Sequence, residues 1–355
     1  MYTDNFAPVH ARERVCEPGD FIFAAAALDH GHINGMCGSL AAAGGVLKYV
    51  YDADIRRAGA LASRFPGAVA VSDLQIILED KEIALVAAAA ITSQRAGLGI
   101  RVMEAGKDYF TDKAPLTTLA QLDAVKAAIA RTNRKYFVYY SERLASECSV
   151  YAGQLIDAGV IGRVISVDGL GPHRLGAGRP DWFFRRAEYG GILCDIGSHQ
   201  IEQFLHFTGE SDADVTFART ANFNNPAHPE FEDFGEACLT GANGAASHFR
   251  VDWFTPDGLG TWGDGRVIIL GTKGYIELRK FIDVARERAG NQIYLVDGTG
   301  EYHLNATGKT GFPYFGELIL DCLNRTENAM TQAHALRAAE LCVRAQMRAE
   351  ESGNI

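Results

Sequence analysis

Short apolar runs alternate with amphipathic stretches over residues 21–141, and this alternation constrains the fold more than any other feature of the sequence. Glycines follow the amphipathic stretches at Gly44-Gly45, Gly67 and Gly106, as is usual just past a helix end. Apolar strands separated by helices indicate a parallel sheet covered on both faces, so this part is predicted to be a doubly wound α/β domain. Its strands are expected at 21–28, 46–52, 68–71, 83–91, 108–111 and 135–141.

The pattern changes from about residue 142. In "SHFRVDWF", Phe249, Val251 and Trp253 alternate with polar residues, which is typical of a half-buried strand in an antiparallel sheet. This part is predicted to be α+β, with a large open, mainly antiparallel sheet. We expect helices at 145–158, from near Asp195, at 312–325 and at 329–350, and strands at 163–168, 214–221, 233–240, 245–254, 265–271, 274–279 and 292–296.

We therefore predict two domains, 1–141 and 142–355, with the C-terminal helices free to pack back on the first. The net charge of −10 and the absence of a basic run argue against nucleic acid or an anionic membrane as a partner. Seven scattered cysteines without a CxxC pair indicate a reducing compartment. Neither a signal peptide nor a membrane-spanning run is found, so a cytoplasmic protein is expected.

The stretch "FIFAAAALDHGHING" (21–35) occupies the place of a first strand and phosphate loop. A dinucleotide fingerprint would carry glycines where this chain has Ala27 and Asp29, although Gly31 remains for a tight turn. A carboxylate about 4 Å from a phosphate charge costs on the order of 4 kcal/mol at an effective dielectric near 20. Asp29 is therefore expected to point away and cap the first helix. His30 and His32 beside the turn can act as donors.

Asp52 ends the second predicted strand, twenty-one residues after Gly31. An acid at this place accepts the ribose hydroxyls of NAD and repels a 2′-phosphate, so NAD is favoured over NADP. Arg56 and Arg57 follow closely and keep NADP open as the alternative.

"EAGKDYFTDKAPLTTLAQL" (104–122) and "YGGILCDIGSHQIEQFLHFTG" (189–209) resemble two signatures of the glucose–fructose oxidoreductase/inositol dehydrogenase (Gfo/Idh/MocA) family. "AGVIGRVISV" (158–167) and "GTKGYIEL" (271–278) are similar to two further segments, so the resemblance covers roughly 20–350. It implies a Rossmann-type dinucleotide domain followed by an open-sheet α/β domain. It also implies oxidation or reduction of sugars, cyclitols and related polyols with NAD(P).

Carried over by position, Lys113 matches the lysine of the family's EKP, and Asp195 and His199 match its DxGxH. The chain departs from the family where EKP is "DKA", where TPxxxH is "AITSQR", and where the last acid of HxxD is Glu202. The resemblance and the loop together give the expected cofactor-binding residues: Leu28, Asp29, His30, Gly31, His32, Ile33, Asp52, Ala90, Thr92, Arg95 and Asp112.

The same residues suit the chemistry. Removing a hydride from a secondary alcohol requires a base for the hydroxyl proton, and histidine titrates near neutrality. If a helix starts near Asp195, His199 lies one turn further on the same face, where the carboxylate can orient the imidazole. Lys113 follows the fifth strand and can polarise the substrate oxygen.

Residues facing the substrate are expected at the domain junction and in the loop "GPHRLGAGRPDWFFRR" (171–186). Aromatic faces and charged donors suit a polyhydroxylated ring. The candidates are Glu142, Arg143, His173, Arg174 and Trp182, with Arg179 and Trp262 as further possibilities.

The sequence therefore predicts an NAD-dependent oxidoreductase acting on a sugar, cyclitol or glycoside, assembled as a homodimer or homotetramer. Three alternatives stay open: a glycoside-cleaving or lyase enzyme of the same family that recycles its NAD, a sugar- or nucleotide-binding regulator without catalysis, and a metal-dependent isomerase or lyase. The last would use Asp195, His199 and His173, but no HxxxH pair or acid cluster supports it, so no metal is expected.

Overall fold

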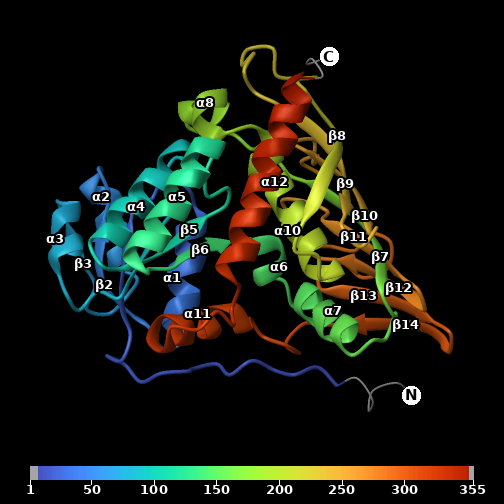
Figure 1. Cartoon of the computed structure of the whole chain (residues 1–355), viewed down its shortest axis with the longest axis horizontal. Helices are drawn as coiled ribbons and strands as arrows, with labels where there is room; N and C mark the ends of the chain where they lie inside the picture. Colours follow the sequence, from blue (N-terminus) through green and yellow to red (C-terminus); the bar gives the residue numbers. More distant parts are fainter. Residues whose placement is uncertain (1–6, 352–355) are drawn as a thin grey trace.

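The computed structural model describes residues 7–351 and contains two sheets (Figure 1). The first is a six-stranded sheet in the order β3-β2-β1-β4-β5-β6, in which every pairing is parallel. Its strands are β1 (Ile22–Ala26), β2 (Val46–Tyr51), β3 (Val69–Val71), β4 (Leu85–Ala88), β5 (Asp108–Asp112) and β6 (Tyr136–Tyr139). The connecting helices are α1 (His32–Ala42), α2 (Ile55–Ala62), α3 (Leu74–Glu79), the 3-10 turn η1 (Thr92–Gln94), α4 (Arg95–Glu104) and α5 (Leu119–Thr132).

The second sheet has eight strands in the order β14-β13-β12-β11-β7-β10-β9-β8, and only the β7–β10 pairing is parallel. Its strands are β7 (Val164–Pro172), β8 (Ala213–Ala221), β9 (Phe234–Gly241), β10 (Ala246–Asp252), β11 (Arg266–Gly271), β12 (Gly274–Arg279), β13 (Gln292–Asp297) and β14 (Gly300–Asn305). The predicted fold class is confirmed for both parts. Strand β14 was not predicted, because "GEYHLN" has little apolar alternation.

Helices cover one face of the second sheet and leave the other uncovered (Figure 1). The helices packed on its strands are α7 (Glu147–Asp157), α9 (Ile192–Asp195), α10 (Gly197–Thr208) and α12 (Gln332–Glu351). The other helical segments of this part are α6 (Ser141–Leu144), η2 (Asp181–Phe184), α8 (Arg186–Tyr189) and α11 (Pro313–Asn324), of which α11 contacts α1. The helix expected to start near Asp195 is therefore two helices that meet at Ile196.

Helix α12 runs between the two sheets (Figure 1) and contacts elements of both. Gln332 accepts a hydrogen bond from the backbone N–H of Tyr136 at 2.7 Å, and the Tyr140 hydroxyl donates to the carbonyl of Ala335 at 3.0 Å. The C-terminal helices thus lie against the first sheet, while the division of the chain at residue 141 stays a prediction.

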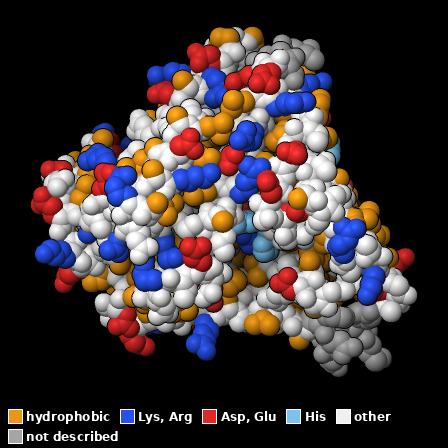
Figure 2. All heavy atoms as spheres, in the orientation of Figure 1, with side chains coloured by type: hydrophobic (Ala, Val, Ile, Leu, Met, Phe, Trp, Pro, Cys, Tyr) orange, Lys and Arg blue, Asp and Glu red, His pale blue; other side chains and the backbone are white. Residues whose placement is uncertain are grey.

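The surface carries both signs of charge. On the face shown in Figure 2, acidic and basic side chains are interspersed over both halves. No helix within residues 7–351 combines the length and the apolar character needed to cross a bilayer.

Helix α4 approaches the first sheet closely at Gly99. A Cβ at this position would stand 2.6 Å from ring atoms of both Tyr109 and Tyr136, which are buried. Gly97 in the same helix is exposed, and a Cβ there would meet no atom within 4 Å. Replacing Gly99 therefore tests the close packing, whereas replacing Gly97 changes only the helix propensity of α4.

We expect Gly99→Ala to destabilise the protein by about 1–3 kcal/mol, because the methyl group overpacks against two rigid rings. Gly97→Ala should instead stabilise it by about 0.5–1 kcal/mol, since alanine is the better helix former. Urea denaturation of both variants without ligands measures the difference. Equal effects of the same sign would contradict the close packing described here.

Candidate active site

A cavity of about 450 Å³ lies where the carboxyl ends of the first sheet meet the second domain. Three of the sequence-predicted site residues that line it, Lys113, Asp195 and His199, come from different elements and are brought together by the fold. The full lining is His30, His32, Lys113, Tyr139, Ser141, Glu142, Ala145, His173, Arg174, Arg179, Asp195, His199, Trp253, Trp262 and Phe281.

Lys113 and Asp195 form an ion pair across this cavity, with Nζ 2.6 Å from Oδ1. The lysine also donates to the backbone carbonyl of Asp195 at 3.2 Å. Burial alone would raise the pKa of Asp195, but Lys113 outweighs it and lowers this pKa to about 2. The pair ties the end of β5 to the end of α9.

The expected contact between Asp195 and His199 is not formed. Within residues 7–351, no hydrogen bond joins the two side chains, and the carboxylate is held by Lys113 instead. Asp195 ends α9 while His199 lies in α10, so the one-turn spacing of a single helix does not apply. Asp195 therefore does not orient the His199 imidazole, as the sequence predicted, but holds the Lys113 ammonium.

His199 is 1% exposed, and its Nδ1 has no hydrogen-bond partner among the described residues. Burial lowers the pKa of this imidazole well below the ordinary value, and Lys113 lowers it further, while Glu142 opposes the shift. His199 is therefore a neutral imidazole that can accept a proton.

Glu142 is the carboxylate that acts most strongly on His199. It is buried, forms an ion pair with Lys280, and accepts from the Gln200 amide at 3.1 Å. Burial would raise the pKa of Glu142, but Lys280 outweighs it, and the pKa falls to about 2. His173 Nε2 lies 3.8 Å from Oε1 of the same carboxylate. Sequence reasoning missed Lys280, because a single lysine after a strand carries no signal of its partner.

Two predicted substrate residues point elsewhere. Arg143 pairs with Glu202, whose carboxylate also lies 3.1 Å from His334, and the three residues join α6, α10 and α12. Trp182 does not line the cavity and packs against Phe183. The aromatic side chains of the cavity wall are Tyr139, Trp253, Trp262 and Phe281, while His173 and Arg174 line the cavity as expected.

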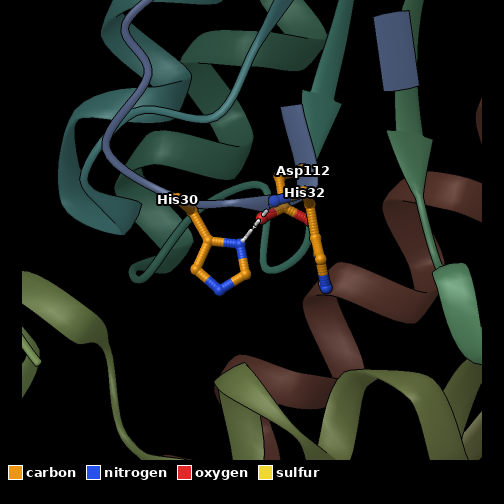
Figure 3. A group of neighbouring side chains, drawn as sticks. All are labelled: His30, His32 and Asp112. Carbon is orange, nitrogen blue, oxygen red and sulfur yellow. Dashed lines mark hydrogen bonds and ion pairs between the residues drawn. The ribbon is translucent and has the colours of Figure 1, made fainter. Parts of the chain in front are cut away.

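Asp112, at the end of β5, gathers the loop that precedes α1. It accepts from His30 Nδ1 at 2.9 Å and from His32 Nδ1 at 2.8 Å (Figure 3). It also lies 3.3 Å from Arg95. The backbone N–H of Lys113 also donates to it at 2.8 Å. These contacts fix the loop against the segment that carries Lys113.

The charge of the Asp112 carboxylate determines how the rings of His30 and His32 bind to it. Burial would raise the pKa of Asp112, but His32, Arg95 and His30 hold it well below the ordinary value, so the group is ionised. An ionised carboxylate only accepts hydrogen bonds, so the Nδ1 of each ring is the donor in its contact with Asp112. Burial, followed by the nearby His32, lowers the pKa of His30 to about 4.

His30, His32 and Asp112 also form the one group in the described part of the chain with three ligand atoms close enough for a metal ion. The set His173, Asp195 and His199 considered from the sequence is not brought to such distances within residues 7–351. In the first group, a cation would compete with Arg95 for the same carboxylate.

Asp29 does not cap the first helix as expected. The residue before α1 is Gly31, and no side chain caps it. Arg57, in the first turn of α2, instead contacts Asp29 at 3.0 Å and Asp52 at 2.7 Å. The charge of Asp29 is thus neutralised by an arginine reaching across from the next helix.

A second cavity, of about 680 Å³, lies on the other side of this loop. Asp52 lines it and accepts from the backbone N–H of Leu28 at 2.7 Å and of Asp54 at 2.8 Å. A Cβ at Gly31 would face open space, and Ala27 adopts φ 53°, the left-handed conformation usually given by glycine. An open turn at the start of a helix, between two cavities, fits a dinucleotide.

The remaining expected cofactor residues are placed as follows. Ala90 lines the second cavity, Ile33 is buried in the core, and Thr92 is buried in η1. Arg95 lines neither cavity, because it donates to the carbonyls of Ala90 at 2.7 Å and Ala114 at 3.0 Å and contacts Asp112. Arg95 therefore holds the backbone and the carboxylate around the site and does not face a ligand.

Comparison with known proteins gives two family matches. Residues 30–140 match an oxidoreductase family described as an NAD-binding Rossmann fold, and residues 150–277 match the GFO/IDH/MocA C-terminal domain. Among solved structures, a putative oxidoreductase from Erwinia carotovora atroseptica SCRI1043 is 49% identical, with a TM-score of 0.90, over 93% of this chain and 99% of that one.

Two more distant relatives are sugar dehydrogenases by name. D-xylose dehydrogenase from Paenarthrobacter nicotinovorans is 28% identical over 137 residues, 36% of this chain, and the match spans only 34% of that protein's length. Levoglucosan dehydrogenase, solved with NADH and levoglucosan, shares the fold at 18% identity and a TM-score of 0.77, over 94% of this chain and 98% of that one. The chain belongs to the Gfo/Idh/MocA family of NAD(P)-dependent oxidoreductases, with the family's Rossmann domain followed by its C-terminal domain.

Proposed function

We propose that this protein oxidises a hydroxyl group of a sugar, cyclitol or glycoside, or reduces the corresponding ketone, with NAD as the cofactor. One observation carries the proposal: Lys113, Asp195 and His199 line a single cavity directly beside the dinucleotide loop. The name of D-xylose dehydrogenase, a relative over part of the chain, supports a sugar-like substrate.

The chain's own residues have separate tasks in this reaction. The bound nicotinamide supplies the hydride acceptor. His199, neutral at physiological pH, accepts the hydroxyl proton, and the Lys113 ammonium stabilises the charge that develops on the same oxygen. Asp195 holds Lys113 in place at 2.6 Å. Glu142, close to His199, favours the imidazolium that forms.

We infer NAD in preference to NADP from the charges around the second cavity. Its lining includes the carboxylates of Asp29, Asp52 and Asp73 against the guanidinium groups of Arg57 and Arg101. Arg57 is already paired with two of these carboxylates. A 2′-phosphate would add negative charge where acids are in excess.

We also propose a homo-oligomer, built on the uncovered face of the second sheet. Leu170, Ile268, Leu270 and Tyr275 are 36–46% exposed there, on neighbouring strands β7, β11 and β12. Phe217 on β8 is similarly exposed. An uncovered sheet face that exposes several apolar side chains suits a second copy of the chain.

His199→Ala and Lys113→Ala should each lower kcat by about 10²–10⁴-fold with little change in cofactor affinity, because both act on one proton transfer. The double variant should lose little more than either single one. NADH formation at 340 nm over a panel of aldoses, anhydrosugars and cyclitols measures this, with His228→Ala, outside the cavity, as control. Because the pKa of His199 is lowered, the acid limb of kcat/KM should lie below the ordinary histidine range near 6.5.

Near-normal turnover of His199→Ala on the best substrate would contradict the acid–base assignment. Product formed without accumulation of NADH, at catalytic amounts of NAD, would instead indicate a cleavage reaction that recycles the cofactor.

NADH should bind at least about tenfold more tightly than NADPH. Asp52→Asn should reduce this ratio by removing a negative charge from the second cavity. Asp54→Asn is the matched control, because Asp54 lies two residues away, caps α2 and does not line the cavity. Calorimetric titration with both dinucleotides gives the ratio, and tighter NADPH binding by the unaltered protein would refute this preference.

Light scattering at micromolar concentration should give at least twice the chain mass of 38.5 kDa. Ile268→Arg on the uncovered sheet face should shift the protein toward the monomer, since the interface would have to bury a long charged side chain in place of an apolar one. Ile76→Arg, equally exposed on α3, should leave the mass unchanged. A monomeric unaltered protein would show that this face is free in solution.

A further inference from the structure

Arg179 lines the active-site cavity without a partner of opposite charge. Within residues 7–351, no carboxylate oxygen lies within 4.0 Å of its guanidinium nitrogens. The other charged lining residues are each paired: Lys113 with Asp195, Glu142 with Lys280 and Arg174 with Asp257. Because the protein's own charges are satisfied in pairs, Arg179 leaves one positive charge for a ligand to neutralise.

The side chain is held in a defined orientation. Its Cζ lies 4.6 Å from the ring centroid of Phe183 and 4.9 Å from that of Trp253, both within cation–π range. Its Nε donates to the carbonyl of Leu175 at 2.8 Å. Neither terminal nitrogen makes a hydrogen bond to another described residue, so the edge that pairs with carboxylates in a bidentate manner is free.

Arg179 also lies near the reacting groups. Burial lowers its pKa while the charge of Asp195 acts in the opposite direction, and an arginine keeps its charge under such shifts. Asp195 is engaged with Lys113 at 2.6 Å. A ligand carboxylate on Arg179 would therefore lie in the same cavity as the hydroxyl that faces Lys113 and His199.

We propose that the substrate is a sugar acid whose carboxylate binds the terminal nitrogens of Arg179 while a ring or chain hydroxyl lies at Lys113 and His199. This inference rests on the proposed oxidoreductase function and narrows its substrate class. The carboxylate is unchanged in the reaction: the CH–OH group becomes a ketone, its hydride goes to NAD and its proton to His199. Trp253, Trp262 and Phe281 provide apolar walls for the carbon skeleton.

The test compares acids with their neutral isosteres on the NADH-loaded protein. The probes are D-glucuronate, D-galacturonate and D-xylonate, each against its amide, with D-glucose 6-phosphate as a second anion. Calorimetry and thermal shift report binding without turnover. We expect at least one acid to bind about a hundredfold more tightly than its amide, because a desolvated charge pair is lost in the amide. The same acid should be oxidised with NAD.

Arg179→Gln should reduce the acid-to-amide ratio to within about threefold and leave NADH affinity unchanged. Arg185→Gln is the matched control, because Arg185 belongs to the same loop, is exposed, and pairs with Glu188 outside the cavity. Arg179→Lys should recover only part of the preference, since an ammonium lacks the bidentate edge.

The outcomes separate this inference from the proposed function. Oxidation of neutral sugars with no preference for acids, unaffected by Arg179→Gln, would overturn the sugar-acid inference and keep the dehydrogenase. Preference for the phosphate over every carboxylate would also overturn it. Acid binding that depends on Arg179, without NADH formation from any probe, would support the anion site and count against the dehydrogenase.

Discussion

The buried carboxylate of Asp112 is the contact on which the rest of the site depends. A charge without exposure to water is tolerated only when several partners replace its hydration, and removing one partner of such a group typically costs about 3–5 kcal/mol. Here His30, His32, Arg95 and a backbone N–H supply these partners. Because they come from the α1 loop, α4 and the end of β5, one side chain fixes three segments of the first domain relative to one another.

The ion pair between Lys113 and Asp195 extends this order across the domain junction. Asp112 positions the backbone of Lys113, and Lys113 in turn binds α9 of the second domain. Glu142 and Lys280 form a second buried pair close to His199. Charges fixed before a substrate arrives need not reorganise during the reaction, which is the main source of electrostatic catalysis. The position of the charged groups in the cavity therefore depends on contacts that start at Asp112, at the end of β5.

The sequence was sufficient for whatever depends on local pattern. Strand and helix periodicity predicted both sheets. The family motifs singled out Lys113, Asp195 and His199, which line one cavity in the structure. The sequence did not predict which residues form ion pairs with one another. Asp29 was expected to cap a helix and binds Arg57 from the next one, while Arg143 was expected at the substrate and binds Glu202. Such pairs depend on distances between elements far apart in the chain, which no single-sequence pattern contains.

The departures from the family pattern belong together. Taken singly, the acid of "DKA", the arginine in place of the TPxxxH histidine and the histidines in the glycine-poor loop each look like a lost feature. In the structure they are one network, because Asp112 is the acid, Arg95 the arginine, and His30 and His32 its other partners. Ala27, at φ 53°, keeps the backbone path that a glycine would provide. The loop therefore retains its open turn at Gly31 through buried hydrogen bonds where the family relies on glycine.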